Sequence, residues 1–213
     1  MLARKMILVL IVVALVTMSC GITLNFPMED VRTIPTVVED LIIPLPENSG
    51  TMQLTLGFGA GELYLSPGAE QALVEGKATY NVDELKPKVH TDGSSVRIET
   101  GNLEIQGLPN FRDRYEHQWD LKLLDTPMDL VINAGAYKGS FDLGGLSLVS
   151  LRVTDGAADV DLDFSAPNRV VMDSLRYETG ASSVRLNRLS NANFERLDFK
   201  GGAGDYTLDF SGD

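Results

Sequence analysis

The sequence predicts an all-β fold: a single-domain β-solenoid whose stacked repeats are about 21–24 residues long. Three observations lead to this expectation. A segment that begins with leucine and contains a Gly-Ala pair recurs along the chain, and apolar and polar residues alternate on both sides of that pair. The chain also holds 20 glycines and many Asn/Asp-rich junctions, which suit a fold with frequent turns.

The recurring segment occurs four times in the C-terminal part of the chain and once near the start. It reads LVINAGAYKGSFDL from Leu130, LRVTDGAADVDLDF from Leu151, LRYETGASSVRLNR from Leu175, LDFKGGAGDYTLDF from Leu197 and LTLGFGAGELYLSP from Leu54. The glycines of the Gly-Ala pairs are Gly59, Gly135, Gly156, Gly180 and Gly202, of which the last four are 21, 24 and 22 residues apart. A period in this range is typical of solenoids, in which each repeat buries its apolar face only against its neighbours.

Alternation within a repeat predicts two short strands around a glycine bend. Leu151 and Val153 point to one side of the first strand, and Val160, Leu162 and Phe164 alternate with aspartates in the second. Stacking should produce apolar ladders of Leu130, Leu151, Leu175 and Leu197, and of Ile132, Val153, Tyr177 and Phe199. The alanine after each glycine is expected to pack inside the bend, at Ala60, Ala136, Ala157, Ala181 and Ala203.

Residues 70–125 break the period but still favour β structure. We expect strands over residues 72–80, 86–90, 95–99 and 119–124, with a turn at residues 91–94. The polar segment 107–116 is predicted to be a surface loop, and His117 is expected to lie in this polar region.

The N-terminus predicts export. Residues 1–19 combine Arg4 and Lys5 with a short apolar stretch, as a secretory signal does, and the stretch is short for a membrane span. Cys20 follows as the only cysteine, so no internal disulfide can form. Its position resembles a bacterial lipobox, which implies a lipid on Cys20, although Thr17 stands where an aliphatic residue is usual. The competing interpretation is an uncleaved signal anchor from Met6 to about Phe26.

These features give the expected organisation of the chain. Residues 1–19 are a lipoprotein signal peptide, 20–50 a lipid-anchored stalk, and 51–213 the β-solenoid, with regular repeats from about residue 130. Four prolines interrupt the stalk, within which Val37–Ile43 can pair as an edge strand. The last repeat ends near the last residue of the sequence, and an uncovered last repeat would expose a sheet edge that invites pairing with another chain. Either the sequence is shortened and further repeats follow, or something else covers that edge.

Charge narrows the range of partners. The formal net charge is -12, and without residues 1–19 the balance is 16 basic against 30 acidic residues, or -14. Such a surface repels phosphate backbones and anionic lipid heads, so no nucleic-acid partner is expected and only the N-terminus should hold the membrane. The remaining expected partners are another protein or a second copy at the sheet edge.

No catalytic, metal or cofactor site is predicted, and Cys20 is the one functional residue that the sequence names. The two histidines, His90 and His117, are too few for a zinc site without carboxylates. Acidic residues along the second strands, Asp142, Asp159, Asp161, Asp163 and Asp209, could hold Ca²⁺ but are interpreted as a solvated face. Arginines 152, 176 and 185 are interpreted as pairing with nearby aspartates.

Trp119, with Tyr115 and Phe111, could stack on sugars, although Trp119 fits the core better because it starts an alternating strand.

Three stretches carry a family resemblance: LGFGAGELYL at Leu56–Leu65, EGKATYNVDELKPKV at Glu75–Val89, and the Gly-Ala repeats through Leu208. They resemble the toast-rack family of bacterial envelope proteins, which is close to the adhesin-like and cell-wall-stress-response proteins. The resemblance covers nearly all of residues 50–213 and implies a β-solenoid on secreted, often lipid-anchored proteins.

The leading functional hypothesis is an extracytoplasmic, membrane-anchored lipoprotein that is not an enzyme and whose solenoid makes protein or envelope contacts, in adhesion or in sensing envelope stress. One alternative is a β-helix that binds or cleaves glycans. Another is an extracytoplasmic sensory module for a membrane partner.

Overall fold

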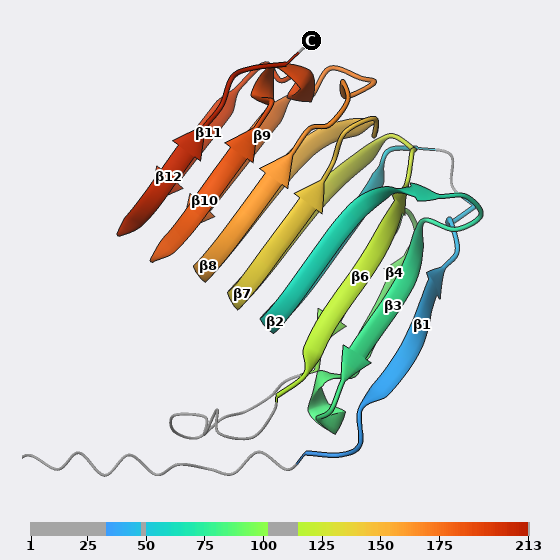
Figure 1. Cartoon of the computed structure of the whole chain (residues 1–213). Helices are drawn as coiled ribbons and strands as arrows, with labels where there is room; N and C mark the ends of the chain where they lie inside the picture. Colours follow the sequence, from blue (N-terminus) through green and yellow to red (C-terminus); the bar gives the residue numbers. More distant parts are fainter. Residues whose placement is uncertain (1–32, 48–49, 102–114, 213) are drawn as a thin grey trace, which may run out of the picture. The chain divides into compact units, whose positions relative to one another are not determined.

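The computed structural model describes residues 33–47, 50–101 and 115–212, which form an all-β fold without α-helix. The strands belong to a single twelve-stranded sheet, and two short 3₁₀ helices interrupt the chain (Figure 1). The strands are β1 (Val37–Ile43), β2 (Met52–Ala69), β3 (Val74–Tyr80), β4 (Pro87–Asp92), β5 (Ser95–Thr100), β6 (His117–Leu124), β7 (Met128–Asp142), β8 (Leu148–Asp163), β9 (Ser174–Thr179), β10 (Ser182–Asn187), β11 (Leu197–Gly201) and β12 (Gly204–Leu208). The helices are η1 (Asp83–Leu85) and η2 (Leu189–Ala192).

The Gly-Ala repeats pair in parallel and in register, as the sequence predicts. Leu130 of β7 lies opposite Leu151 of β8, and Leu175 of β9 and Leu197 of β11 continue the same ladder. The early copy joins them, because Leu54 of β2 lies opposite Leu130. The second strands follow the same order, with β12 beside β10 and β10 beside β8.

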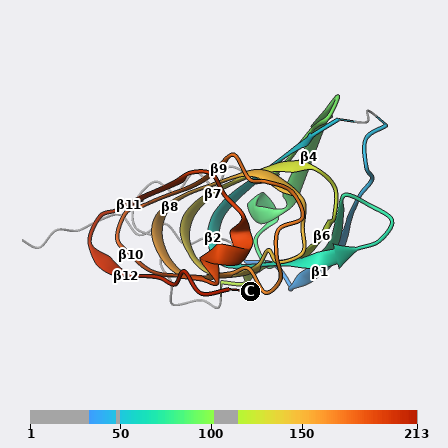
Figure 2. The same ribbon diagram turned by 90° about the horizontal axis from the view of Figure 1, so that it is seen from above.

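The sheet bends at every Gly-Ala pair, so its two halves lie on opposite sides of one apolar core (Figure 2). Strands β2, β7 and β8 run unbroken through the bend, whereas the last two repeats break there into β9 and β10 and into β11 and β12. Before the bend, residues such as Leu151 and Val153 point inward, and after it Val160 and Leu162 do so. This burial is the main source of stability, at about 25 cal/mol per Å² of apolar surface removed from water.

Close backbone approach is the reason for glycine at the bends. A Cβ added to Gly180 would lie 2.3 Å from the carbonyl oxygen of Gly156, and one on Gly202 would lie 2.4 Å from that of Gly180. The contact is similar between Gly135 and Gly59, at 2.4 Å, and looser between Gly156 and Gly135, at 3.1 Å. The carbonyl of one repeat therefore occupies the space that a side chain would need in the next.

The expectation that the following alanine packs inside the bend is wrong. Ala136, Ala157, Ala181 and Ala203 are exposed, and Ala60 is only partly buried. The reason is that the alternation of inward and outward residues shifts by one position at the bend. The inward positions are therefore the residue before the glycine and the second residue after it. Asp155 and Ser182 are buried residues at such positions.

The segment before residue 130 covers the first end of the repeats. β5 pairs in parallel with the first half of β2, and β6 pairs in parallel with the second half. β4 is antiparallel to β5, and β3 is antiparallel to β6. β1 then pairs antiparallel with β3 along its full length, so the sheet extends into the range 20–50 that we expected to be stalk, and Val37–Ile43 is the edge strand foreseen as an option there.

Other strand predictions between residues 70 and 125 agree with the structure within a few residues. Most of the loop predicted at 107–116 lies outside the described residues. His117, expected in a polar region, is instead the first residue of β6 and is buried.

Replacing Gly180 with Ala tests the bend contact. The new Cβ would meet a backbone carbonyl that cannot rotate away, so the free energy of unfolding should fall by about 1–3 kcal/mol or more. Gly50→Ala is the matched control, because a Cβ on Gly50 meets nothing within 4 Å, and it should change stability by less than about 0.5 kcal/mol. Urea unfolding of both variants measures the difference, and equal stabilities would contradict the steric role.

Candidate functional site

The polar residues of the repeats occupy three places: the interior of the first bend, the outward faces of the strands, and the ends of the second strands. Cys20, the one functional residue that the sequence names, lies outside the described residues, so its lipid remains a prediction.

A buried carboxylate lies inside the first bend. Asp155 Oδ2 accepts hydrogen bonds from Tyr177 Oη at 2.7 Å and from Tyr137 Oη at 3.3 Å, while Oδ1 accepts one from Thr179 Oγ1. Thr179 Oγ1 is also hydrogen-bonded to Ser182 Oγ at 2.6 Å, with the hydroxyl hydrogen of Ser182 available for that bond. Burial raises the pKa of both tyrosines, which keeps them as hydroxyl donors. The hydroxyls satisfy the buried charge in place of a cation, so this network ties three consecutive repeats together.

Outward-facing charges form short ladders between repeats. Arg185 of β10 lies 3.3 Å from Asp161 and 3.8 Å from Asp159, both on β8. On the other half of the sheet, Arg176 pairs with Asp198 at 3.3 Å. These pairs agree with the interpretation of Arg176 and Arg185 as partners of aspartates, whereas the charge of Arg152 acts on Glu178. All these side chains are substantially exposed, so each pair contributes little stability and mainly sets the surface charge.

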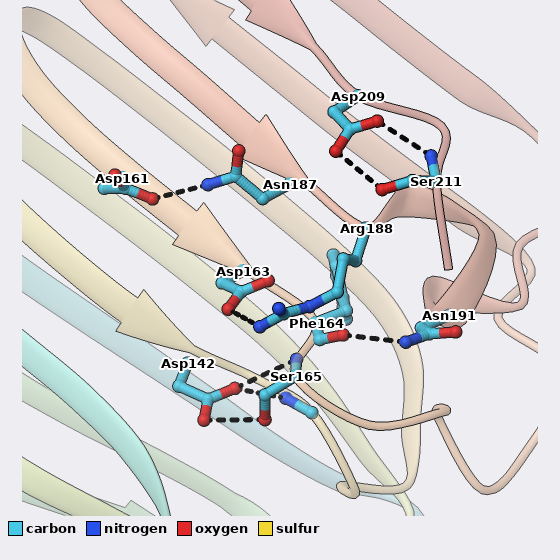
Figure 3. A network of polar contacts seen from close by, with 11 residues as sticks. Asp142, Asp161, Asp163, Phe164, Ser165, Asn187, Arg188, Asn191, Asp209 and Ser211 are labelled. Atoms are coloured by element: carbon cyan, nitrogen blue, oxygen red, sulfur yellow. Dashed lines mark hydrogen bonds and ion pairs between the residues drawn. The ribbon is translucent and has the colours of Figure 1, made fainter. Parts of the chain in front are cut away.

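Carboxylates also mark the ends of the second strands (Figure 3). Asp142 accepts hydrogen bonds from Ser165 Oγ at 2.7 Å and from Gly144 N at 3.0 Å. Asp209 accepts from Ser211 N at 2.8 Å and from its Oγ at 2.6 Å, and these bonds lower the pKa of Asp209.

In the intervening repeat, an arginine replaces these hydroxyl partners. The guanidinium of Arg188 contacts Asp163, and Arg188 has a left-handed backbone with φ of 52°. Burial raises the pKa of Asp163, and the positive charge of Arg188 opposes the shift. The carboxylates therefore turn toward their own neighbours. Within the described residues, no three His, Cys, Asp or Glu side chains gather in a way that could hold a metal ion.

An aromatic cluster closes the core near the bend of β2. The His117 ring stacks on Phe58 with centroids 4.4 Å apart, and its Nδ1–H donates to the Ala60 carbonyl at 2.5 Å. Trp119 packs edge-on against both rings and is 0% exposed. The prediction that Trp119 packs in the core is therefore confirmed, and the alternative of a sugar-stacking platform is wrong for this residue, since no sugar could reach its face. Phe111, the third member of that platform, lies outside the described residues.

The last repeat leaves its ladder residues incompletely covered. Leu175 and Tyr177 are fully buried, yet Leu197 and Phe199, which continue their ladders, are only half-buried. The second strand shows the same change, because Val184 and Leu186 are buried whereas Tyr206 and Leu208 are half-buried. We call the β11–β12 border the open edge.

Comparison with solved structures finds similar folds. A "putative cell adhesion protein" from Clostridium sporogenes is 19% identical, with a TM-score of 0.70, over 82% of this chain and 99% of that one. A "putative adhesin" from Bacteroides fragilis is 8% identical, with a TM-score of 0.26, over 82% and 96% of the two chains. The second score is too low to support an argument, and the first shows a shared fold. A comparison with curated proteins finds no match.

Parallel repeats joined by glycine bends place the chain among repeat-built all-β proteins. More specifically, the chain belongs to the toast-rack family: the model described as the N-terminal domain of toast_rack, DUF2154, matches residues 32–173. No helix among the described residues has the length and apolar character needed to cross a membrane.

Two polar features went unnoticed in the sequence. Asp155 precedes its bend glycine at a position where the neighbouring repeats have Ala134 and Thr179, and its inward parity with Leu151 and Val153 signals burial. His117 likewise shares the inward parity of Trp119 and Leu121.

Burial of His117 predicts a pH-dependent stability. Burial lowers the pKa of His117 to about 4, against 6.5 for an ordinary histidine, so the unfolded chain takes up a proton first as the pH falls. The stability from neutral His117 is present above pH 6.5 and is lost between about pH 6.5 and 4, by about 3 kcal/mol. His117→Phe keeps the stacking and removes the titration. Unfolding curves across this window should fall less steeply for the variant, and parallel curves would rule out His117 as the cause.

Proposed function

We propose that the chain is a non-enzymatic scaffold of the bacterial cell envelope, that its repeats form a β-solenoid, and that the open edge contacts another protein. The observation that carries the proposal is the open edge itself. Half-buried apolar residues there adjoin backbone groups that meet no neighbouring strand within residues 33–47, 50–101 and 115–212, and such edges pair readily with other chains.

The distribution of polar groups supports contact rather than chemistry. The outward-facing arginines Arg176 and Arg185 pair with aspartates of adjacent repeats, and these pairs follow the outer faces of the sheet as ladders. The name of the Clostridium sporogenes protein, a "putative cell adhesion protein", agrees with a contact role.

The anchor completes the proposal. A lipid on Cys20 would hold the chain at the membrane, and residues 21–36 would precede β1, the first strand of the sheet. The acidic surface is repelled by anionic lipid heads, so attachment through the N-terminus would leave the repeats free to meet a partner.

Replacing Cys20 with Ser tests the anchor. The variant should lose incorporation of radiolabelled palmitate and should shift from the membrane fraction to the soluble exported fraction. Labelling that persists in Cys20→Ser would contradict lipidation, and membrane retention without lipid would favour the uncleaved signal anchor.

Site-specific photocrosslinking tests the open edge as the contact surface. A photoreactive residue at Phe210, beside the last repeat, should give a discrete crosslinked protein in native membranes. The control position is Val38 on β1, because both side chains are 58% exposed. A product from Val38 and none from Phe210 would place the contact elsewhere, and a membrane kinase in the Phe210 product would favour the sensory alternative.

A further inference from the structure

Strand β1 forms an edge of the sheet at the opposite end from β12. It pairs antiparallel with β3, and no other strand within residues 33–47, 50–101 and 115–212 lies beside it. A further Gly-Ala repeat would stack on β11 and β12, at the other end of the sheet, and so could not cover β1. What can pair with β1 is therefore decided by the residues of β1 itself and of its neighbour β3.

The backbone groups on the free side of β1 belong to Val38, Asp40 and Ile42. Leu124 N donates to Leu73 O, so the odd-numbered residues of β3 face β6 and the even-numbered residues face β1. In the register of β1 on β3, the residues opposite those even-numbered positions are Val37, Glu39, Leu41 and Ile43. The other residues of β1 therefore direct their N–H and C=O groups away from the sheet.

Apolar side chains flank this free edge on the outer face of the sheet. Val38 is 58% exposed and Ile42 is 69% exposed, whereas Leu41 and Ile43 on the inner face are buried. An edge strand with exposed apolar side chains is a template for pairing with another strand. Pro44 ends the row of free N–H groups, because proline has none. The edge that a new strand can use therefore runs from Val38 to Ile42.

A row of alternating charge crosses the outer face and ends at Asp40. Asp120 of β6 lies opposite Lys77 of β3, and Lys77 in turn lies opposite Asp40, with Lys77 Nζ 3.7 Å from the Asp40 carboxylate. The side chains of Lys77 and Asp40 are 65% and 70% exposed, so the pair is weak and leaves the carboxylate open to a second cation. The alternation therefore favours a positive charge opposite Asp40 on the next strand.

The surroundings of Asp40 favour a basic side chain as well. A hollow of about 590 Å³ lies beside Asp40 on the outer face. Its charged lining residues are Asp40, Glu70, Glu75, Asp120, Lys77 and Lys122. A hydrogen bond from the backbone N–H of Gln71 lowers the pKa of Glu75, so this carboxylate is ionised at neutral pH. Four carboxylates against two lysines attract Lys or Arg more than a neutral side chain.

The sequence itself supplies no suitable strand outside its predicted signal peptide. A strand that fits needs Lys or Arg opposite Asp40 and an apolar residue two positions to either side, opposite the exposed apolar residues of β1. Arg4 alone among the basic residues has Val, Ile, Leu, Met or Phe at both positions, as Leu2 and Met6, and these lie in the predicted signal peptide. A second copy of the chain fits poorly for the same reason, and antiparallel pairing of β1 with itself would set Asp40 against Asp40.

We infer that β1 binds an extended segment of a different protein, which adds as a strand along Val38–Ile42 and places Lys or Arg, between two apolar residues, opposite Asp40. This inference goes beyond the proposed function, because it assigns a second contact surface at the opposite end of the sheet from the open edge. Backbone hydrogen bonds give affinity, while the basic residue and its apolar neighbours give specificity.

A fluorescent peptide with the sequence TVTKTIT is the probe, because it holds a lysine between valine and isoleucine at the required spacing. Fluorescence anisotropy with the full-length protein in detergent should show saturable binding that weakens with added salt. A second peptide, TVTETIT, should bind at least about tenfold more weakly. Asp40→Lys in the protein should reverse this preference. Asp92→Lys, an equal charge change on the exposed edge strand β4, should leave the preference unchanged.

Ile42→Pro tests the backbone contact. Proline removes an N–H group on the free side of β1, while the bonds of β1 to β3 come from its odd-numbered residues and are kept. Peptide binding should be lost, and the fluorescence spectrum of Trp119, the only tryptophan and a core residue, should stay native. Ile42→Thr is the matched control, because it keeps the N–H group, and it should retain binding within about fivefold.

Three results would overturn the inference: no saturable binding of TVTKTIT up to about 1 mM, equal affinity for the two peptides, or unchanged binding to a natively folded Ile42→Pro variant. Because Val38 lies on this edge, a photoreactive residue there should give a crosslinked product that differs from the product of Phe210. A product from Phe210 and none from Val38 would leave the proposed contact function standing and remove this inference. A product from Val38 and none from Phe210 would support binding at β1 and contradict contact through the open edge.

Discussion

Stacking of one backbone on another at the glycine bends is the constraint on which the rest of the sheet depends. Where a carbonyl lies only 2.3–2.4 Å from the place a Cβ would take, one repeat can rest directly on the next. That contact fixes the register at the bend, and the inward residues on both sides then fall into ladders such as Leu151 on Leu130 and Leu162 on Phe141. The looser contact at Gly156, 3.1 Å, shows that the spacing tolerates some variation.

Polar chemistry follows from the same geometry. The inner positions before the bend glycines hold Phe58, Ala134, Asp155 and Thr179 in successive repeats, and the carboxylate of Asp155 is reached by donors from an adjacent repeat. On the outer face, the in-register pairing places charged side chains of neighbouring strands opposite each other. The outward aspartates of β8 pair with either Arg185 or Arg188. The acidic surface thus has local charge neutralisation within the stack, while Asp205 on β12 is exposed.

The sequence alone predicts the repeats and their register, because the repeat period and the apolar alternation come from residues that the stacking of one repeat on the next requires. It does not predict which residues face inward at the bend. Strict alternation from Leu130 through Ile132 carries Ala136 inward, whereas the chain changes parity at Gly135 and buries Tyr137 instead. The prediction for His117 was wrong for a related reason. Its neighbours in the sequence are polar, which favoured a polar region, although its side chain lies on the same side of the strand as that of Trp119. Arg188 could not be foreseen, since only its left-handed backbone directs it toward Asp163.

The pairing of β2 on both of its edges has a consequence for how the chain folds. From β8 onward, each strand pairs with one that lies about one repeat earlier, so these contacts close short loops and can form one after another. β2 differs, because its pairing with β7 joins Met52 to Met128 across the whole middle segment. Closing that loop costs more conformational entropy than any of the later pairings. We therefore expect the meeting of β2 and β7 to be the slow step of folding, and in a chain made from its N-terminus β2 is complete long before β7 appears.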